Sequence, residues 1–189
     1  MNMKISRLRI VGFVIVMIGL SSCGQKKQPS TPDKDFDGWK TFETSDYSIR
    51  YPSTWDFDNS GRMGMALQIF SPLTSADDNF RDNVNLVIQD LSGQTVKTLD
   101  QYTQLSVSQI KAMMTDSEIL SSVRLIRDGK EFQMVAFKAV QGQFKLMFVQ
   151  YYLIKEKMAY VLTLTFEADK FDIYNEVGGK ILDSFKTKK

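Results

Sequence analysis

Hydrophobic and polar residues alternate with a period of two in several short stretches, a spacing that predicts β-strands. The first two strands are expected at residues 39–43 and 47–51, with a turn between them. Further strands are predicted at 65–70, 84–89, 119–127, 131–140, 144–153 and 158–167. Short turns, including Asp128-Gly129, join the last four of these strands, and this order predicts an antiparallel meander.

Apolar residues spaced three or four apart predict two helices. Thr98 and Gln101 form a capping-box pattern at the start of the first helix, which is expected to run to about residue 115. Its apolar face should contain Tyr102, Leu105, Ile110 and Met113. Asp169 is expected to cap the second helix, whose apolar stripe is Tyr174, Val177, Ile181 and Phe185. Gly178 and Gly179 each destabilise this helix by about 1 kcal/mol relative to alanine, so we expect them to allow close packing on a sheet.

The strand predicted at 144–153 is apolar on both sides. One alternate set holds Phe144, Leu146, Phe148 and Tyr152, and the other holds Met147, Val149, Tyr151 and Leu153. A strand of this kind is buried on both faces. The pattern therefore predicts an α+β protein with an antiparallel sheet that helices cover on both faces, an α/β/α sandwich.

Residues 1–22 have the layout of a secretory signal peptide. Three basic residues precede an uncharged run at residues 10–20, and two serines follow it. A run of 11 residues suits a signal peptide and is well short of the ~20 that a membrane-spanning helix needs. A permanent transmembrane helix is the alternative.

The only cysteine of the chain, Cys23, follows Leu20-Ser21-Ser22. This tetrad resembles the lipobox of bacterial lipoproteins, in which the thiol is alkylated with diacylglycerol and the signal is cut just before the cysteine. The resemblance implies that Cys23 becomes a lipid-bearing N-terminus held in the membrane. A buried or free thiol is the alternative. We expect a place in the cell envelope on the extracytoplasmic side, and Gly24 rather than Asp after the cysteine favours an outer membrane if the cell has one.

Residues 23–37 are expected to be the lipidated cysteine and a flexible tether, because this stretch is rich in charged residues and proline and has Phe36 as its only large apolar residue. Residues 38–189 then form one folded domain. Without residues 1–22, 21 basic residues stand against 22 acidic ones, a formal charge of −1. So small a charge gives no basic field, and nucleic acid is not an expected partner.

The chain has no histidine, which excludes imidazole bases, histidine metal ligands and cysteine–histidine pairs. Ser108 and Lys111 have the spacing of an SxxK nucleophile and base, but the other motifs of that enzyme class are missing, so a polar helix face is expected. The carboxylates Asp56, Asp58, Asp77, Asp78 and Asp82 are expected to stabilise turns rather than to act as acid and base. Trp39, Trp55, Tyr151 and Tyr152 are expected in the core rather than on a ligand platform.

Three short motifs carry a family resemblance: Tyr47–Pro52 followed by Trp55, Asp82-Asn83-Val84-Asn85, and Ile181-Leu182-Asp183-Ser184-Phe185. With the order of elements, they make residues 38–187 similar to the PsbP-like proteins. That fold is shared by the PsbP subunit of photosystem II, a Ran-binding nuclear-import factor and DcrB-type bacterial lipoproteins. The resemblance implies the sandwich fold and an accessory or docking role rather than an enzymatic one.

Asp33, Asp35 and Asp37, followed by Gly38, match the first half of a calcium-binding loop. Thr44 stands where that loop needs a bidentate glutamate, so the motif is incomplete and an acidic linker is the alternative. Calcium is the one cofactor that the sequence suggests. A second candidate site is the loop at residues 59–65, where Arg62 and Met63 beside two glycines could contact a protein partner.

The sequence as a whole predicts a membrane-anchored, non-enzymatic lipoprotein that binds or assembles with an unidentified envelope protein, and a monomeric chain. A calcium- or small-ligand-binding lipoprotein is the alternative, and a hydrolase is the third hypothesis. A pocket with convergent polar groups would favour the ligand-binding alternative.

Overall fold

The computed structural model describes residues 34–188, so Cys23, Asp33 and the expected signal peptide lie outside the described residues. The strands are β1 (Trp39–Glu43), β2 (Tyr47–Pro52), β3 (Asp56–Asp58), β4 (Leu67–Phe70), β5 (Asn83–Asp90), β6 (Thr115–Arg127), β7 (Lys130–Gln141), β8 (Phe144–Lys155), β9 (Met158–Glu167) and β10 (Lys186–Thr187). The helices are α1 (Leu99–Met113) and α2 (Phe171–Asp183), with the 3₁₀ turns η1 (Lys34–Phe36), η2 (Arg62–Gly64) and η3 (Ala168–Lys170).

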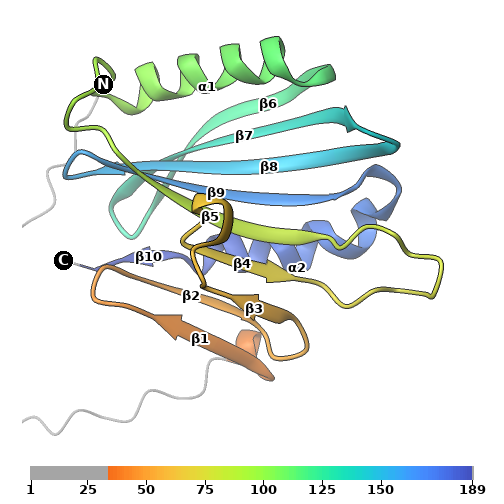
Figure 1. Cartoon of the computed structure of the whole chain (residues 1–189). Helices are drawn as coiled ribbons and strands as arrows, with labels where there is room; N and C mark the ends of the chain where they lie inside the picture. Colours follow the sequence, from red (N-terminus) through yellow and green to blue (C-terminus); the bar gives the residue numbers. More distant parts are fainter. Residues whose placement is uncertain (1–33, 189) are drawn as a thin grey trace, which may run out of the picture. The chain divides into compact units, whose positions relative to one another are not determined.

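The strands form two antiparallel sheets rather than the one sheet expected from the sequence (Figure 1). The small sheet has the order β1-β2-β10, and the large one has the order β3-β4-β5-β9-β8-β7-β6. The predicted meander is confirmed, since β6, β7, β8 and β9 pair in succession. Strands β3 and β10 were not predicted because segments of three and two residues are too short to show a period.

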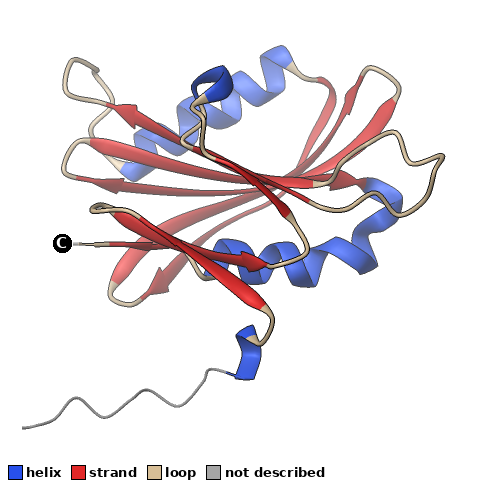
Figure 2. Ribbon diagram, turned by 60° about the horizontal axis from the view of Figure 1, so that its bottom comes forward, coloured by secondary structure: helices blue, strands red, loops and turns tan. Residues whose placement is uncertain are grey.

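The two helices pack on different strands, and the mixed α+β class is confirmed. Helix α1 contacts β6, β7 and β8, whereas α2 contacts β9, β5 and β2. Alternate residues of β9 join different apolar clusters: Leu162 and Leu164 pack with α2, and Val161 packs with the cluster that includes Tyr102 of α1. Because successive side chains of a strand point to opposite faces, the two clusters lie on opposite sides of β9. Figure 2 shows the two long helices apart from each other, with strands between them.

Helix α2 follows the predicted stripe. Tyr174 and Ile181 are buried, Val177 packs against the same cluster, and Phe185 is buried just after the helix ends. The prediction that glycine allows close packing is confirmed at Gly178, where an added Cβ would lie 2.5 Å from Cδ1 of Leu164. It is wrong at Gly179, which has nothing within 4 Å of that position.

The predicted cap of α2 is wrong. Asp169 lies in η3, and the residue before the helix is Lys170, which makes no side-chain cap hydrogen bond. The 3₁₀ turn that runs into α2 moves the start of the helix one residue beyond the start that Asp169 would cap.

Helix α1 agrees less well with its predicted face. The capping box is confirmed, since Thr98 Oγ1 accepts from the N–H of Gln101 at 3.2 Å and the Gln101 side chain accepts from the N–H of Thr98 at 3.3 Å. Tyr102 and Ile110 are buried, but Leu105 is 44% exposed and Met113 is 82% exposed. The helix presents a narrower apolar stripe to the sheet than the spacing predicted.

Residues just before β1 also pack on the domain. The ring of Phe36 meets the ring of Trp39 edge to face at 5.1 Å, and the guanidinium of Arg50 lies 4.5 Å from the centre of the Phe36 ring. Within residues 34–188, neither helix is long and apolar enough to cross a membrane.

Candidate functional site

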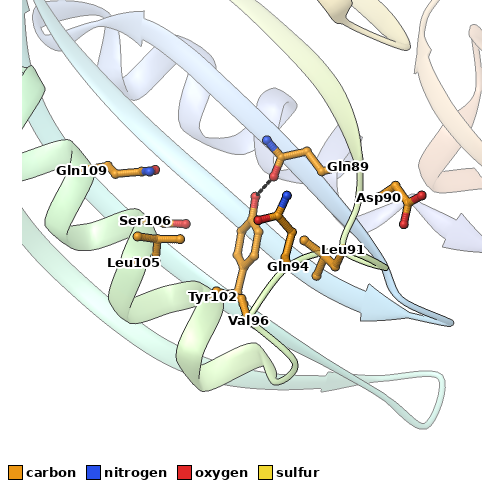
Figure 3. Close-up of a pocket in the computed structure, with 9 residues that line it drawn as sticks. All are labelled: Gln89, Asp90, Leu91, Gln94, Val96, Tyr102, Leu105, Ser106 and Gln109. Atoms are coloured by element: carbon orange, nitrogen blue, oxygen red, sulfur yellow. Dashed lines mark hydrogen bonds between the residues drawn. The ribbon is translucent and has the colours of Figure 1, made fainter.

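A pocket of about 460 Å³ lies between α1, the end of β5 and the segment that connects them (Figure 3). Its lining consists of Gln89, Asp90, Leu91, Gln94, Val96, Tyr102, Leu105, Ser106 and Gln109. This volume falls in the range of small-molecule sites, which is roughly 300–1,000 Å³.

The pocket follows from where α1 packs. The chain leaves β5 at Asp90, is fixed by a backbone hydrogen bond of 2.7 Å from Leu91 N–H to the carbonyl of Lys157, and returns at the cap of α1. The helix then packs over β6, β7 and β8, so the end of β5 and the flank of α1 remain partly open. Leu105 is half exposed because it lines this opening rather than the core.

Tyr102 joins the two walls of the pocket. Its ring packs edge to face against Tyr152 at 5.4 Å, and its hydroxyl donates to Oε1 of Gln89 at 2.5 Å. Burial raises the pKa of Tyr102, and a hydrogen bond with Ser106 opposes this shift only in part. The phenol therefore stays protonated at neutral pH and can act as a hydrogen-bonding group.

The remaining polar groups of the pocket are uncharged, apart from Asp90. Gln89, Gln94 and Gln109 offer amides that can both donate and accept, next to the apolar side chains of Leu91 and Val96. The Asp90 carboxylate accepts from the N–H of Ser92 at 2.7 Å, and Figure 3 shows it at the end of β5, farther from α1 than the Gln89 amide. Amide and hydroxyl groups beside apolar surface are suited to binding a small molecule by hydrogen bonds and contact.

The sequence missed most of this pocket. It singled out Tyr102 and Leu105 as core residues, and the glutamines carried no motif. They meet only because the segment after β5 turns back beneath α1. Glutamines at 89 and 109 beside apolar positions were the only available signal, and such residues are common on exposed surfaces.

The residues proposed for partner binding lie elsewhere. Arg62 and Met63 form η2, and Met63 is 82% exposed with a left-handed backbone (φ 55°) between Gly61 and Gly64, which also have positive φ. Neither residue lines the pocket. Their part in partner binding stays a prediction.

Of the three calcium candidates, Asp35 belongs to η1 and Asp37 follows it, both exposed, while Asp33 is outside the described residues. In the part of the chain from 34 to 188, no three Cys, Asp or Glu side chains are placed to hold a metal ion. The calcium loop therefore stays a prediction as well.

The possible nucleophile of the SxxK pattern is used within its own helix. Ser108 Oγ donates to the carbonyl of Gln104 at 2.8 Å, one turn earlier. A hydroxyl bound to the backbone in this way favours the polar helix face over catalysis.

Two of the five carboxylates expected to stabilise turns behave in this way. Asp58 accepts from the N–H of Ser60 at 2.8 Å, and Asp78 accepts from the N–H groups of Thr74 at 2.9 Å and Phe80 at 3.3 Å. These hydrogen bonds confirm that the two side chains stabilise turns.

Asp82 is an exception, because it is fully buried rather than at a solvated turn. Its Oδ1 accepts from the N–H of Glu167 at 3.0 Å, while its Oδ2 lies 3.6 Å from Nζ of Lys170 and makes no hydrogen bond with the described residues. Burial raises the pKa of Asp82, although the Glu167 N–H and the Lys170 charge oppose the shift. Burial also disfavours the charge of Lys170, but hydrogen bonds to Glu167 at 2.5 Å and Asp78 at 2.9 Å raise its pKa overall. The cluster fixes the loop before β5 to the start of α2.

The aromatic residues proposed for the core are confirmed there. Trp55, Tyr151 and Tyr152 are buried, and Trp39 packs against the same cluster as Trp55. Tyr151 and Tyr152 belong to clusters on opposite faces of β8, so they cannot form one ligand platform.

The fold is the PsbP-like fold, as the sequence motifs predicted. No protein-family model matches the sequence, and no curated protein matches it. The similarity comes from solved structures. Cyanobacterial PsbP (CyanoP) from Synechocystis has a TM-score of 0.60 at 15% identity, over 89% of this chain and 99% of that one.

Two further structures share the fold. LpqN of Mycobacterium tuberculosis, which is involved in cell envelope biogenesis, has a TM-score of 0.58 at 12% identity, over 86% of this chain and 100% of its own. The Ran-binding protein Mog1p of Saccharomyces cerevisiae has a TM-score of 0.52 at 9% identity, over 78% and 94% of the two chains. At such identities the likeness is one of fold.

Proposed function

We propose that this chain is a non-enzymatic binding module of the cell envelope, held to the membrane through a lipid on Cys23. The pocket beside α1 carries the proposal, because uncharged amide and hydroxyl groups meet apolar side chains there. LpqN, which shares the fold, is an envelope protein, and this supports the location. We also infer the full α/β/α layering, with α1 and α2 over opposite faces of the large sheet.

Crosslinking in cells tests the binding role. A photoreactive amino acid replaces Leu105 at the pocket, Met63 in η2, or Glu176 on the outer side of α2 as the control. An adduct with a protein at Leu105 or Met63 but not at Glu176 would support an assembly role and identify the surface. Equal adducts at all three positions, or none, would count against it.

The anchor has its own test, which the Leu20-Ser21-Ser22-Cys23 tetrad motivates. We expect Cys23→Ala to abolish labelling with radioactive fatty acid and to leave an uncleaved precursor, because the thiol is the acylated atom. Ser22→Ala is the matched control, since it keeps a small residue before the cysteine. Normal processing and labelling of Cys23→Ala would end the lipoprotein proposal.

A small-ligand-binding lipoprotein is the second candidate, favoured by the volume of the pocket. Native mass spectrometry of protein purified from its own cells would show a bound small molecule, which Gln109→Ala should release. Calcium belongs to this candidate through Asp33, Asp35 and Asp37. We expect millimolar calcium to leave the melting temperature unchanged, because Thr44 stands where the loop needs a bidentate glutamate. A thermal scan would detect binding, since a ligand at 100 times its Kd adds ~2.7 kcal/mol to the free energy of unfolding.

A further inference from the structure

The two edges of the large sheet are very different. Strand β3, at one edge, has three residues and carries an aspartate at each end. Strand β6, at the other edge, has 13 residues. Short, charged edges resist pairing with another chain, whereas long edges present a row of unpaired N–H and C=O groups.

Strand β6 also exposes apolar side chains. Leu120 is 46% exposed, Val123 is 41% exposed and Ile126 is 72% exposed. In the part of the chain from 34 to 188, nine large hydrophobic residues are exposed, and these three of them lie on the same strand. An edge that combines free backbone groups with exposed β-branched residues is a surface on which another strand can add.

The half of β6 that can accept a strand is the second half. Its pairing with β7 shifts register between Thr115 and Glu118 and again between Ile119 and Ser121, so the first half is bulged. From Ser121 to Arg127 the register is unbroken. A bulge disrupts the row of backbone groups that an added strand would pair with, whereas the regular segment keeps that row intact.

We propose that β6 pairs antiparallel with β6 of a second copy of this chain, which joins the two large sheets across a twofold axis. The charges along β6 favour this partner. The acids Asp116 and Glu118 precede the apolar centre, and the bases Arg124 and Arg127 follow it. Antiparallel pairing of two copies therefore places the acidic half of each strand beside the basic half of the other, whereas parallel pairing would align like charges.

The register follows from the same residues. Pairing centred on Arg124 would set two guanidinium groups directly opposite each other, which is destabilising. Pairing centred on Val123 sets two β-branched side chains together and Ser121 opposite Leu125 of the second copy. The regular ladder then runs from Ser121 to Leu125 of each copy, and beyond the bulge at Leu120 the Glu118 side chain comes near Arg127 of the second copy.

The charged side chains have room for this contact. Glu118 pairs with Lys138 at 2.7 Å and is 59% exposed, and Arg127, paired with Asp183, is 31% exposed. Arg127 also donates to the Tyr151 hydroxyl at 3.1 Å, and the exposed part of each side chain is available for a further partner. The proposal departs from the monomer expected from the sequence, and it depends neither on the pocket nor on the anchor.

Disulfide trapping tests the register. The full chain in detergent, with Cys23→Ser so that no other thiol is present, carries either Val123→Cys or, as the control at the opposite edge, Asp58→Cys. Facing Cα atoms in an antiparallel pair are about 4.5–5.5 Å apart, which suits a disulfide. We expect Val123→Cys to form the linked dimer about tenfold faster than Asp58→Cys, and equal rates would overturn the proposed register.

Sedimentation equilibrium of the wild-type chain tests the pairing itself. We expect a reversible dimer whose Kd rises about tenfold or more in Val123→Lys, which places two ammonium groups at the twofold axis. Glu176→Lys on the outer side of α2 should leave the Kd unchanged. A wild-type chain that remains monomeric at about 100 μM, or a dimer that Val123→Lys does not weaken, would overturn the proposal. Capture of a different protein by β6 in cells, without the homodimer, would also overturn it and assign the edge to that partner.

Discussion

The two helices rest on the large sheet in different ways. Helix α2 lies close to β9, with Gly178 against Leu164 and with Ile181 and Leu182 almost fully buried. Helix α1 buries Tyr102 and Ile110, leaves Leu105 and Met113 exposed, and has a pocket of about 460 Å³ along its flank. Packing is therefore close under α2, whereas the flank of α1 leaves an unfilled pocket.

The polar groups differ in the same way. Near α2, charged groups are buried and paired in the cluster of Asp78, Asp82, Glu167 and Lys170. Beside α1 the pocket is lined by amides and hydroxyls, with Asp90 as its one charged side chain. A buried charge is strongly destabilising when its partner is lost, whereas an exposed amide is not. Mutations near α2 should therefore lower the free energy of unfolding much more than mutations near α1.

The largest expected effect is loss of packing under α2. Ile181→Ala removes three carbons from a residue that is 0% exposed, and we expect it to lower the free energy of unfolding by about 4 kcal/mol. Leu105→Ala, at the pocket, should lower it by less than about 1 kcal/mol because that side chain is already half exposed. Urea denaturation measures the free energy of unfolding of both variants. Similar decreases would contradict the closer packing under α2 than beside α1.

The next effect concerns the buried charges. We expect Lys170→Met to lower the free energy of unfolding by about 3 kcal/mol at pH 7, because Asp78 and Asp82 lose their cation. The exposed Lys180→Met, which breaks only a pair with Glu176, should change stability little.

The pH dependence of this pair of variants sharpens the test. In the wild type the pKa of Lys170 is raised above 10.5, so its contribution is present at acidic and neutral pH and is lost as the pH rises through the folded-state value. The pKa of Asp78 is lowered below 3.8, so its contribution is present at neutral pH and is lost as the pH falls through the folded-state value. Without Lys170 both aspartates protonate more readily. The destabilisation should therefore be smaller at pH 4 than at pH 7, and a loss independent of pH would contradict the buried ion cluster.

The smallest expected changes in stability come from replacing the two adjacent glycines of α2 by alanine. Gly178→Ala places a methyl group against the buried Leu164 and should lower the free energy of unfolding by about 2 kcal/mol. Gly179→Ala meets nothing within 4 Å and should raise it by roughly 0.5–1 kcal/mol through helix propensity. Thermal unfolding of the two variants should shift in opposite directions. Shifts of the same sign would mean that α2 does not pack closely at Gly178.

The stripe of α2, the capping box of α1 and the four-strand meander were predictable because each depends on neighbours within a few residues. The split into two sheets was not, because β10 pairs with β2 after more than 130 intervening residues. Asp82 was misjudged for a related reason, since its Oδ1 is bound by Glu167 at the end of β9, 85 residues away.

The sequence by itself determined the hydrophobic periods, the turns, the absence of histidine chemistry and the lipobox pattern at Cys23, because these are local or compositional properties. Only the tertiary structure decided that Gln89 and Gln109 meet at a pocket, that Leu105 lines it, and that β6 is the last strand of the large sheet among the described residues. These outcomes depend on which strands α1 covers. That choice is made by the packing of side chains from distant segments, and no local pattern encodes it.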